Sequence, residues 1–225
     1  MERQDLIELY KTTFPFWDGL SDWDKETFVK SSYSVTYRRG DNIHDGGECT
    51  GVILIKSGQL RLYMLSEDGK EVTLYRLFPG EMCILSASCV LNNLTFDVFI
   101  DAEEDSECVI VGGCAYEGVW QRSDAVKIFT YETALSRFSD IMWLMQQILF
   151  MSMDKRLAIF LLDEVSKSGS DTIKLTHEQI AKYMGSAREV VTRMLKYFVS
   201  EGIISSSRSE GIKIIDKKRL RNIAI

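Results

Sequence analysis

The sequence predicts an α+β protein in three parts: an N-terminal antiparallel β-roll of the jelly-roll type, a long helix, and a C-terminal winged helix-turn-helix. Short β-rich runs divided by turn glycines indicate the roll. An apolar heptad pattern indicates the long helix, and two closely spaced helix-start signals indicate the helix-turn-helix. We place the boundaries at residues 1–120, 121–151 and 152–225.

The composition allows each part to bury a core, because 45% of the 225 residues are hydrophobic. No run of 18 apolar residues occurs and the first residues are charged, which argues against a membrane span and a signal peptide. The five cysteines, an odd number in no compact framework, suit a reducing compartment. We therefore expect a cytoplasmic protein.

The first half begins with a helix signal, Ser21 before residues 22–30, after an aromatic segment that we expect to pack in a core. The pattern then changes to β-rich runs, at residues 52–55, 60–65, 72–77 and 98–100. Asp68–Gly69 between two alternating runs is a strong hairpin signal. Short strands at this spacing predict an antiparallel roll.

Residues 124–151 show apolar side chains at alternating spacings of three and four. They form a predicted heptad seam of Tyr131, Ala134, Phe138, Ile141, Met145 and Ile148. Other faces of this helix are apolar too, so we expect its own β-domain on one side and a twin helix on the other. The alternative is a buried helix in a monomer.

A second helix is predicted over residues 154–166, followed by a short strand at 172–175 and then by two helix starts. Thr176 with Gln179, and Ser186 with Glu189, have the Ser/Thr-x-x-Glu/Gln spacing of a capping box. Gly185 lies between them, where a turn needs positive φ. Runs at 203–206 and 212–215 predict a hairpin wing, and 217–222 a basic helix.

The helix after Gly185 has two different faces. Spacings of three and four place four apolar side chains on one face, Val191, Met194, Leu195 and Phe198. The other face is polar and mostly basic, with Arg188, Glu189, Thr192, Arg193 and Lys196. An apolar back and a basic front are what a helix needs in order to enter a DNA groove.

The net charge of −6 conceals an uneven distribution. Residues 151–225 contain 14 basic and 9 acidic side chains, a balance of +5, whereas residues 1–150 contain 13 and 24, a balance of −11. A basic C-terminal part joined to an acidic N-terminal part suits a sensor attached to a DNA-binding module, with double-stranded DNA as the partner.

Together these motifs resemble the Crp/Fnr superfamily of transcription regulators over nearly the whole chain. The specific matches are Arg156-Leu-Ala, Leu175-Thr-x-x-x-Ile180-Ala, Gly185, Arg188-Glu189-x-x-x-Arg193-x-Leu195 and Gly202-Ile203-Ile204. The turn glycines match more weakly, at Gly40, Gly58, Gly69 and Gly80. The resemblance implies a cyclic-nucleotide-binding-like roll, and a second helix that presents Arg188, Glu189 and Arg193 to the major groove.

The chemistry of these side chains agrees with that implication. Arginine can bind guanine O6 and N7 in a bidentate manner, and glutamate can accept from cytosine N4. Thr176, Ser186 and Lys196 are better placed for phosphate contacts. Two simpler interpretations stay open: Glu189 as a capping acid only, and Arg193 as a solvated charge or the partner of Glu189.

The sequence of the roll differs from that of the cyclic-AMP-binding members of this superfamily. Where they have Gly-Glu and then Arg followed by Ser or Thr, this chain has Ile84-Leu85 and Thr95-Phe96. A buried cyclic phosphate without the arginine would stay unpaired in a low-dielectric pocket, so the sequence argues against cyclic AMP. We expect the segment to line an uncharged effector pocket with Cys83, Leu85, Ser86, Ser88, Cys89, Thr95 and Phe96.

The cysteines and histidines fit no standard cofactor site. No cysteine precedes Cys49, so an iron–sulfur cluster of the oxygen-sensing relatives has no ligands here. Four others, Cys83, Cys89, Cys108 and Cys114, are read as small core residues, with a redox-sensing thiol as the alternative. With only His44 and His177, the usual histidine set of a metal-dependent β-roll enzyme is not available, and we expect no metal or catalytic residue.

The sequence therefore predicts a homodimeric transcription regulator that binds a palindromic site, with an unidentified effector in the roll. RNA polymerase is expected as a further partner. The alternatives are a β-roll that binds a small molecule or metal as an enzyme, and a constitutive regulator whose roll is filled by its own side chains.

Overall fold

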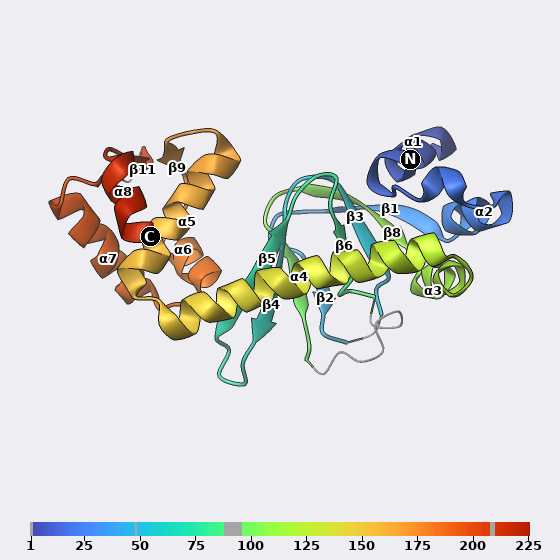
Figure 1. Cartoon of the computed structure of the whole chain (residues 1–225), viewed down its shortest axis with the longest axis horizontal. Helices are drawn as coiled ribbons and strands as arrows, with labels where there is room; N and C mark the ends of the chain where they lie inside the picture. Colours follow the sequence, from blue (N-terminus) through green and yellow to red (C-terminus); the bar gives the residue numbers. More distant parts are fainter. Residues whose placement is uncertain (1, 48, 88–95, 208–209) are drawn as a thin grey trace. The chain divides into compact units, whose positions relative to one another are not determined.

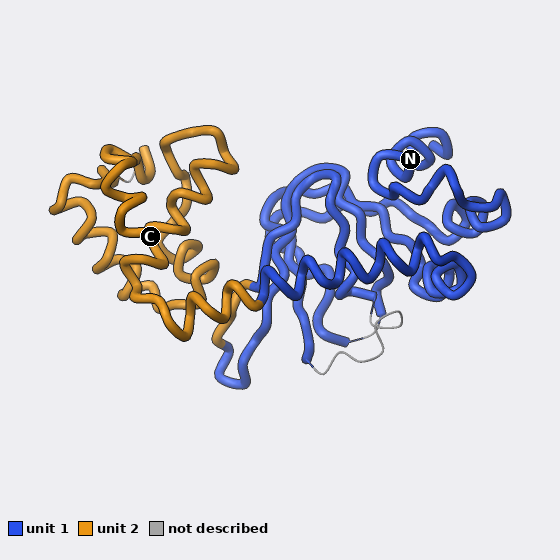
Figure 2. Tube along the Cα trace, viewed as in Figure 1, with its two compact units in different colours: residues 1–69, 74–141 blue, residues 70–73, 142–225 orange. Residues whose placement is uncertain are grey.

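The computed structural model describes residues 2–47, 49–87, 96–207 and 210–225. The chain forms two compact units (Figure 2): unit 1 comprises residues 1–69 and 74–141, and unit 2 comprises residues 70–73 and 142–225. Unit 1 contains two four-stranded antiparallel sheets and most of the helices before residue 141, whereas unit 2 contains helices around a small three-stranded sheet. The predicted α+β fold is confirmed.

The β-roll of unit 1 consists of two sheets. One has the strand order β1-β8-β3-β6, with bounds Ser32–Tyr37, Ser106–Val111, Val52–Ser57 and Met82–Cys83. The other has the order β2-β7-β4-β5, with bounds Asn42–Asp45, Phe99–Ala102, Leu60–Leu65 and Glu71–Leu77. The hairpin between β4 and β5 is confirmed: Gly69 has φ +76°, and its N–H donates to the Ser66 carbonyl at 2.9 Å.

Strand β3 is buried on both of its faces. All four residues from Val52 to Ile55 are buried. Val52 and Leu54 join the core formed with the N-terminal helices, whereas Ile53 and Ile55 project from the opposite face, as alternation in a strand requires. A strand covered on both faces reads as a continuous apolar run. Gly58 then turns the chain at φ +86°, where an added Cβ would lie 2.2 Å from Ser106 Oγ.

A helical cap packs on the first sheet. It consists of α1 (Arg3–Thr13), the 3-10 helix η1 (Trp17–Gly19), α2 (Asp22–Lys30) and α3 (Gly113–Arg122) (Figure 1). Aromatic rings fill the space between these helices, and the centroids of Phe14 and Phe28 lie 5.7 Å apart. Ser21 caps α2 as predicted. Trp23 differs from its aromatic neighbours: it is 64% exposed and lies under the Arg122 guanidinium.

Helix α4 (Asp124–Phe150) starts in unit 1 and ends in unit 2. Its first turns are fixed to the cap because Val126 and Thr130 are buried, and the Tyr116 hydroxyl lies 2.8 Å from Thr130 Oγ1. Two turns further along α4, Arg137 pairs with Glu81 at 3.1 Å and Asp140 at 3.2 Å, and its guanidinium lies over the ring of Tyr75. One side of α4 therefore belongs to the roll.

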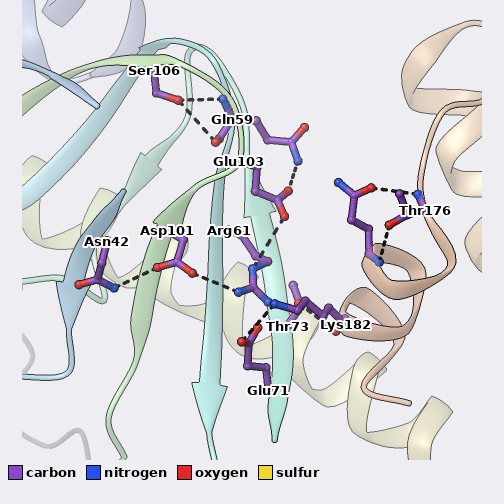
Figure 3. A network of polar contacts seen from close by, with 11 residues as sticks. Asn42, Gln59, Arg61, Glu71, Thr73, Asp101, Glu103, Ser106, Thr176 and Lys182 are labelled. Atoms are coloured by element: carbon purple, nitrogen blue, oxygen red, sulfur yellow. Dashed lines mark hydrogen bonds and ion pairs between the residues drawn. The ribbon is translucent and has the colours of Figure 1, made fainter. Parts of the chain in front are cut away.

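A polar network lies on the second sheet (Figure 3). The buried Arg61 on β4 contacts Asp101 at 3.2 Å and Glu103 at 3.8 Å, both of which belong to β7 or directly follow it. Its guanidinium also lies 4.0 Å from the ring centroid of Tyr63. Two carboxylates offset the cost of burying this cation, so the network is part of the packing of the sheet.

Unit 2 is built on α5 (Met153–Ser168), α6 (His177–Met184), α7 (Arg188–Ser200) and α8 (Lys217–Ala224). Its sheet has the order β10-β11-β9, with bounds Ile204–Ser207, Gly211–Ile214 and Thr172–Ile173. β10 and β11 are the predicted wing. The core contains apolar residues from all these elements, among them Leu161, Ile180, Leu195, Phe198 and Leu220, each at most 1% exposed.

Residues 70–73, which include the start of β5, belong to unit 2 (Figure 2). Thr73 Oγ1 donates to the Lys182 carbonyl at 3.1 Å, and Lys182 Nζ lies 3.3 Å from Glu71 Oε1. Carbonyls in the last turn of a helix have no partner within the helix. The threonine gives the Lys182 carbonyl a second donor, beside the Gly185 N–H at 3.3 Å.

Candidate nucleic-acid interface

Helix α6 begins at the capping box that the sequence predicts. The Gln179 N–H donates to Thr176 Oγ1 at 3.1 Å, and the Thr176 N–H donates to Gln179 Oε1 at 2.9 Å (Figure 3). The helix ends at Gly185, whose φ of +57° is left-handed. The Ser186 N–H then donates to the Ala181 carbonyl at 2.9 Å, which closes the end of α6.

The second predicted capping box is wrong. Helix α7 begins at Arg188, its N-cap is Ala187, and no side chain caps it. Ser186 is used to end α6, and its hydroxyl lies 3.8 Å from Met153 Sδ. Because the helix starts one residue later than the pattern suggests, Glu189 lies in the first turn without a capping partner.

The polar face of α7 is assembled as predicted. Val191, Leu195 and Phe198 are buried in the core of unit 2, and Met194 is half-buried. On the other side, five predicted side chains line one shallow surface hollow: Arg188, Glu189, Thr192, Arg193 and Lys196. None of its charged side chains forms an ion pair within the described part of the chain, so Arg193 is not paired with Glu189.

A groove adjoins this hollow between α6, α7 and the wing. It is lined by Lys174, Leu175, Thr176, His177, Glu178, Arg188, Ser206, Ser207, Glu210, Gly211 and Ile212. His177 joins the two helices, because its Nδ1 lies 3.0 Å from Thr192 Oγ1. Burial, and then the charges of Arg188 and Lys196, lower the pKa of His177 below its ordinary value. Sequence reasoning missed this residue, since a single histidine in a helix matches no motif.

Arg156 on α5 holds the turn between α6 and α7. It is buried, and its Nη2 donates to the Met184 carbonyl. Burial lowers the pKa of this guanidinium. The Arg156-Leu-Ala motif of the sequence thus has a structural use: the arginine supports the turn, and Leu157 and Ala158 enter the core.

The exposed side of α4 carries an apolar stripe that differs from the predicted seam. Tyr131, Phe138, Met145 and Ile148 are exposed as expected, but Ala134 and Ile141 are half-buried. The exposed apolar residues at spacings of three and four are Ile128, Tyr131, Leu135, Phe138, Met142, Met145 and Leu149. We call this set the α4 stripe. It lacks the half-buried Ala134 and Ile141 of the predicted seam, and it adds Ile128, Leu135, Met142 and Leu149.

The predicted effector pocket is only partly brought together. Cys83, Leu85 and Ser86 are buried, and Ser86 Oγ donates to the Gly51 carbonyl at 2.7 Å. Phe96 is 36% exposed. Ser88, Cys89 and Thr95 lie outside the described residues.

The cysteines occupy different environments. Cys49 is disulfide-bonded, which differs from the fully reduced state expected from the sequence, whereas Cys83, Cys108 and Cys114 are free. Burial raises the pKa of Cys83 and raises that of Cys108 to about 12, so both stay protonated thiols at neutral pH. In the described ranges no three His, Cys, Asp or Glu side chains are grouped to hold a metal ion, and no helix is long and apolar enough to cross a membrane.

An open basic face on a helix-turn-helix, a wing, and a separate β-roll define a helix-turn-helix regulator with a sensor-like domain. Comparison with known families agrees: residues 155–223 match the Crp-like helix-turn-helix domain, and residues 34–122 match the cyclic nucleotide-binding domain. A crystal structure of a transcriptional regulator of the crp/fnr family from Eubacterium rectale is 46% identical, covers 94% of this chain and 98% of that one, and has a TM-score of 0.88. The chain belongs to the Crp/Fnr family of transcription regulators.

Two more distant similarities are found, the first of which is a likeness of fold. The structure of FixK2 from Bradyrhizobium japonicum is 19% identical, covers 86% of this chain and 98% of that one, and has a TM-score of 0.71. The cyclic AMP receptor protein of Thermus thermophilus is 23% identical over 84% of this chain and 88% of its own length.

Proposed function

We propose that the chain acts as a homodimer that binds an approximately two-fold DNA site through α7. The main support for this proposal is the open hollow on α7, a helix whose other face is well packed in the core. The hollow is lined by Arg188, Glu189, Thr192, Arg193 and Lys196. In the proposed complex, Arg188, Glu189 and Arg193 contact base edges. Lys196 and Thr176 contact phosphates and set the register of the helix on the duplex. Ser186 contributes less, because its hydroxyl faces Met153.

The α4 stripe supports the proposal of a dimer. It is a continuous set of large apolar side chains along one helix, and exposed patches of this kind mark protein interfaces. A second copy of α4 carries the same stripe, so a two-fold axis along the helices would bury both at once. A two-fold dimer would then present two α7 helices to successive major grooves, about 34 Å apart.

We infer that the effector of the roll is not a cyclic nucleotide. Ile84 and Leu85 occupy the positions where a carboxylate would be needed, and both are buried apolar side chains. Titration with cyclic AMP in a calorimeter should therefore release no binding heat, and saturable binding would contradict the inference. A regulator without any effector remains the competing proposal, favoured by the close packing of Cys83 and Ser86. RNA polymerase is the partner through which we expect bound protein to act.

The direct test is selection of DNA ligands from a random duplex pool, followed by titration across salt concentrations. We expect log Kd to increase linearly with the logarithm of the salt concentration. We also expect the selected DNA site to contain two related halves. Arg188→Ala should lose about 1–3 kcal/mol of discrimination at one base pair in each half. The matched control is Arg38→Ala, an exposed arginine of the roll. Salt-independent binding, or equal binding of matched and mismatched sites by the unmodified protein, would refute the proposal.

A further inference from the structure

The groove beside α7 has the chemistry of a phosphate-binding surface. Its lining includes the cations Lys174 and Arg188 and the hydroxyls of Thr176, Ser206 and Ser207. Such groups are the usual donors to phosphate oxygens in protein–DNA interfaces. His177 lines the same groove. It is the one titratable group among these lining residues whose ordinary pKa is near neutrality.

The position of His177 is fixed by its place at the start of α6 and by a contact with Thr192 on α7. Its ring is half-buried at the first residue of α6, and Nδ1 lies 3.0 Å from Thr192 Oγ1 on the exposed face of α7. A histidine with one nitrogen engaged in this way has its other nitrogen available for a second partner. The neutral ring can donate from only one nitrogen, whereas the protonated ring donates from both.

We propose that His177 is a phosphate-contacting residue of this interface and takes up a proton when DNA binds. The inference rests on the proposed DNA-binding function. It adds a residue to the interface and makes the affinity of the protein for DNA dependent on pH.

The free protein favours the neutral ring. Charged groups border it from every element of the groove: Lys174 before α6, Glu178 on α6, Arg188 and Lys196 on α7, and Glu210 at the wing. Burial and the two α7 cations lower the pKa of His177, so near pH 7 the ring is mostly neutral. A phosphate in the groove reverses this balance, because its negative charge offsets Arg188 and Lys196 and accepts a hydrogen bond from the protonated ring.

The linkage has a definite sign. If the pKa of His177 is higher in the complex than in the free protein, the complex binds more protons, and affinity rises as pH falls between the two values. Each protomer can contribute at most about a tenfold gain for each unit of pH in that interval. For a dimer we expect Kd to tighten by about tenfold or more between pH 7.5 and pH 6.0 at constant salt.

The test is a titration of a selected duplex by fluorescence anisotropy from pH 6.0 to 8.0 at fixed ionic strength. His177→Gln keeps a hydrogen-bonding group beside Thr192 but has no proton to gain, so its Kd should match the unmodified protein at pH 8.0 and be about tenfold weaker at pH 6.0. His177→Arg carries a permanent positive charge and should bind the duplex tightly at both pH 6.0 and pH 8.0. His44→Gln changes the only other histidine and should retain the pH dependence.

The ring itself can be followed by NMR in histidine-labelled protein, where His44→Gln assigns the two signals. We expect the His177 signal to titrate at higher pH in the complex than in free protein. A Kd that does not change with pH, or a pH dependence that persists in His177→Gln, would overturn the inference while leaving DNA binding intact. Absence of DNA binding at any pH at low salt would instead remove the proposed function.

Discussion

A substitution of Leu135 distinguishes the α4 stripe from the predicted seam as the dimer interface, because Leu135 belongs to the stripe but not to the seam. It is 67% exposed in the single chain, and its neighbours in the stripe, Tyr131 and Phe138, are exposed beside it. Ile141, by contrast, belongs only to the predicted seam and is half-buried. If the stripe is the dimer interface, Leu135→Ala should weaken the dimer, whereas Ile141→Ala should mainly destabilise the folded chain.

The magnitude follows from the area still available for burial. Complete burial of a leucine side chain is worth about 2–3 kcal/mol, and the exposed share of Leu135 corresponds to roughly 1.5 kcal/mol. A two-fold interface contains the residue twice, so Leu135→Ala removes about 3 kcal/mol of dimerisation free energy. This corresponds to a dimer Kd that is weaker by roughly a hundredfold.

Sedimentation velocity over a range of protein concentrations measures this change directly. Ile215→Ala is the matched control, because Ile215 is 57% exposed and is not part of α4. Thermal unfolding of each variant keeps loss of folding separate from loss of dimer. The reasoning is refuted if Leu135→Ala dimerises like the unmodified chain while Ile141→Ala, still folded, does not.

Three further predictions concern stability. Thr176→Ala should lower the free energy of unfolding by about 1 kcal/mol in urea, because the Gln179 N–H loses the hydroxyl oxygen that caps α6, and Thr176→Ser should restore it. Phe198→Ala should cost about 3–5 kcal/mol, because the ring is fully buried in unit 2, whereas truncation of its exposed neighbour Val199 should cost little; equal losses would contradict the assigned faces of α7. Burial lowers the pKa of His44, so the unfolded chain protonates first and stability falls as pH drops below about 6.5. Urea unfolding at pH 7.5 and 5.5 should show that loss reduced in His44→Gln, and an unchanged pH dependence would exclude His44 as a contributor.

Local signals predicted most of the fold because each has a short-range cause. The Thr176 capping box and the Asp68–Gly69 hairpin depend only on residues within a few positions of each other. The sequence does not predict helices α1 and α3, because their burial depends on residues far away in the chain: Tyr10 of α1 and Tyr116 of α3 both pack against Phe28 of α2. Ser186 shows the limit of the motif: its spacing to Glu189 predicts a cap for α7, but its N–H closes the end of α6 instead.

The α4 stripe differs from the predicted seam because of the way the roll packs against α4. Heptad spacing identifies a row of side chains along one face of a helix. When several faces are apolar, the spacing does not show which of them contacts a partner. Here the roll decides, because Val126 and Thr130 bind α4 to the cap and rotate Ala134 and Ile141 partly inward. These half-buried positions lie between the roll and the exposed stripe. Any repacking of the roll beneath them would favour one rotation of α4 over another, and hence one arrangement of a dimer built on that stripe. A helix that served the dimer alone would have no such positions.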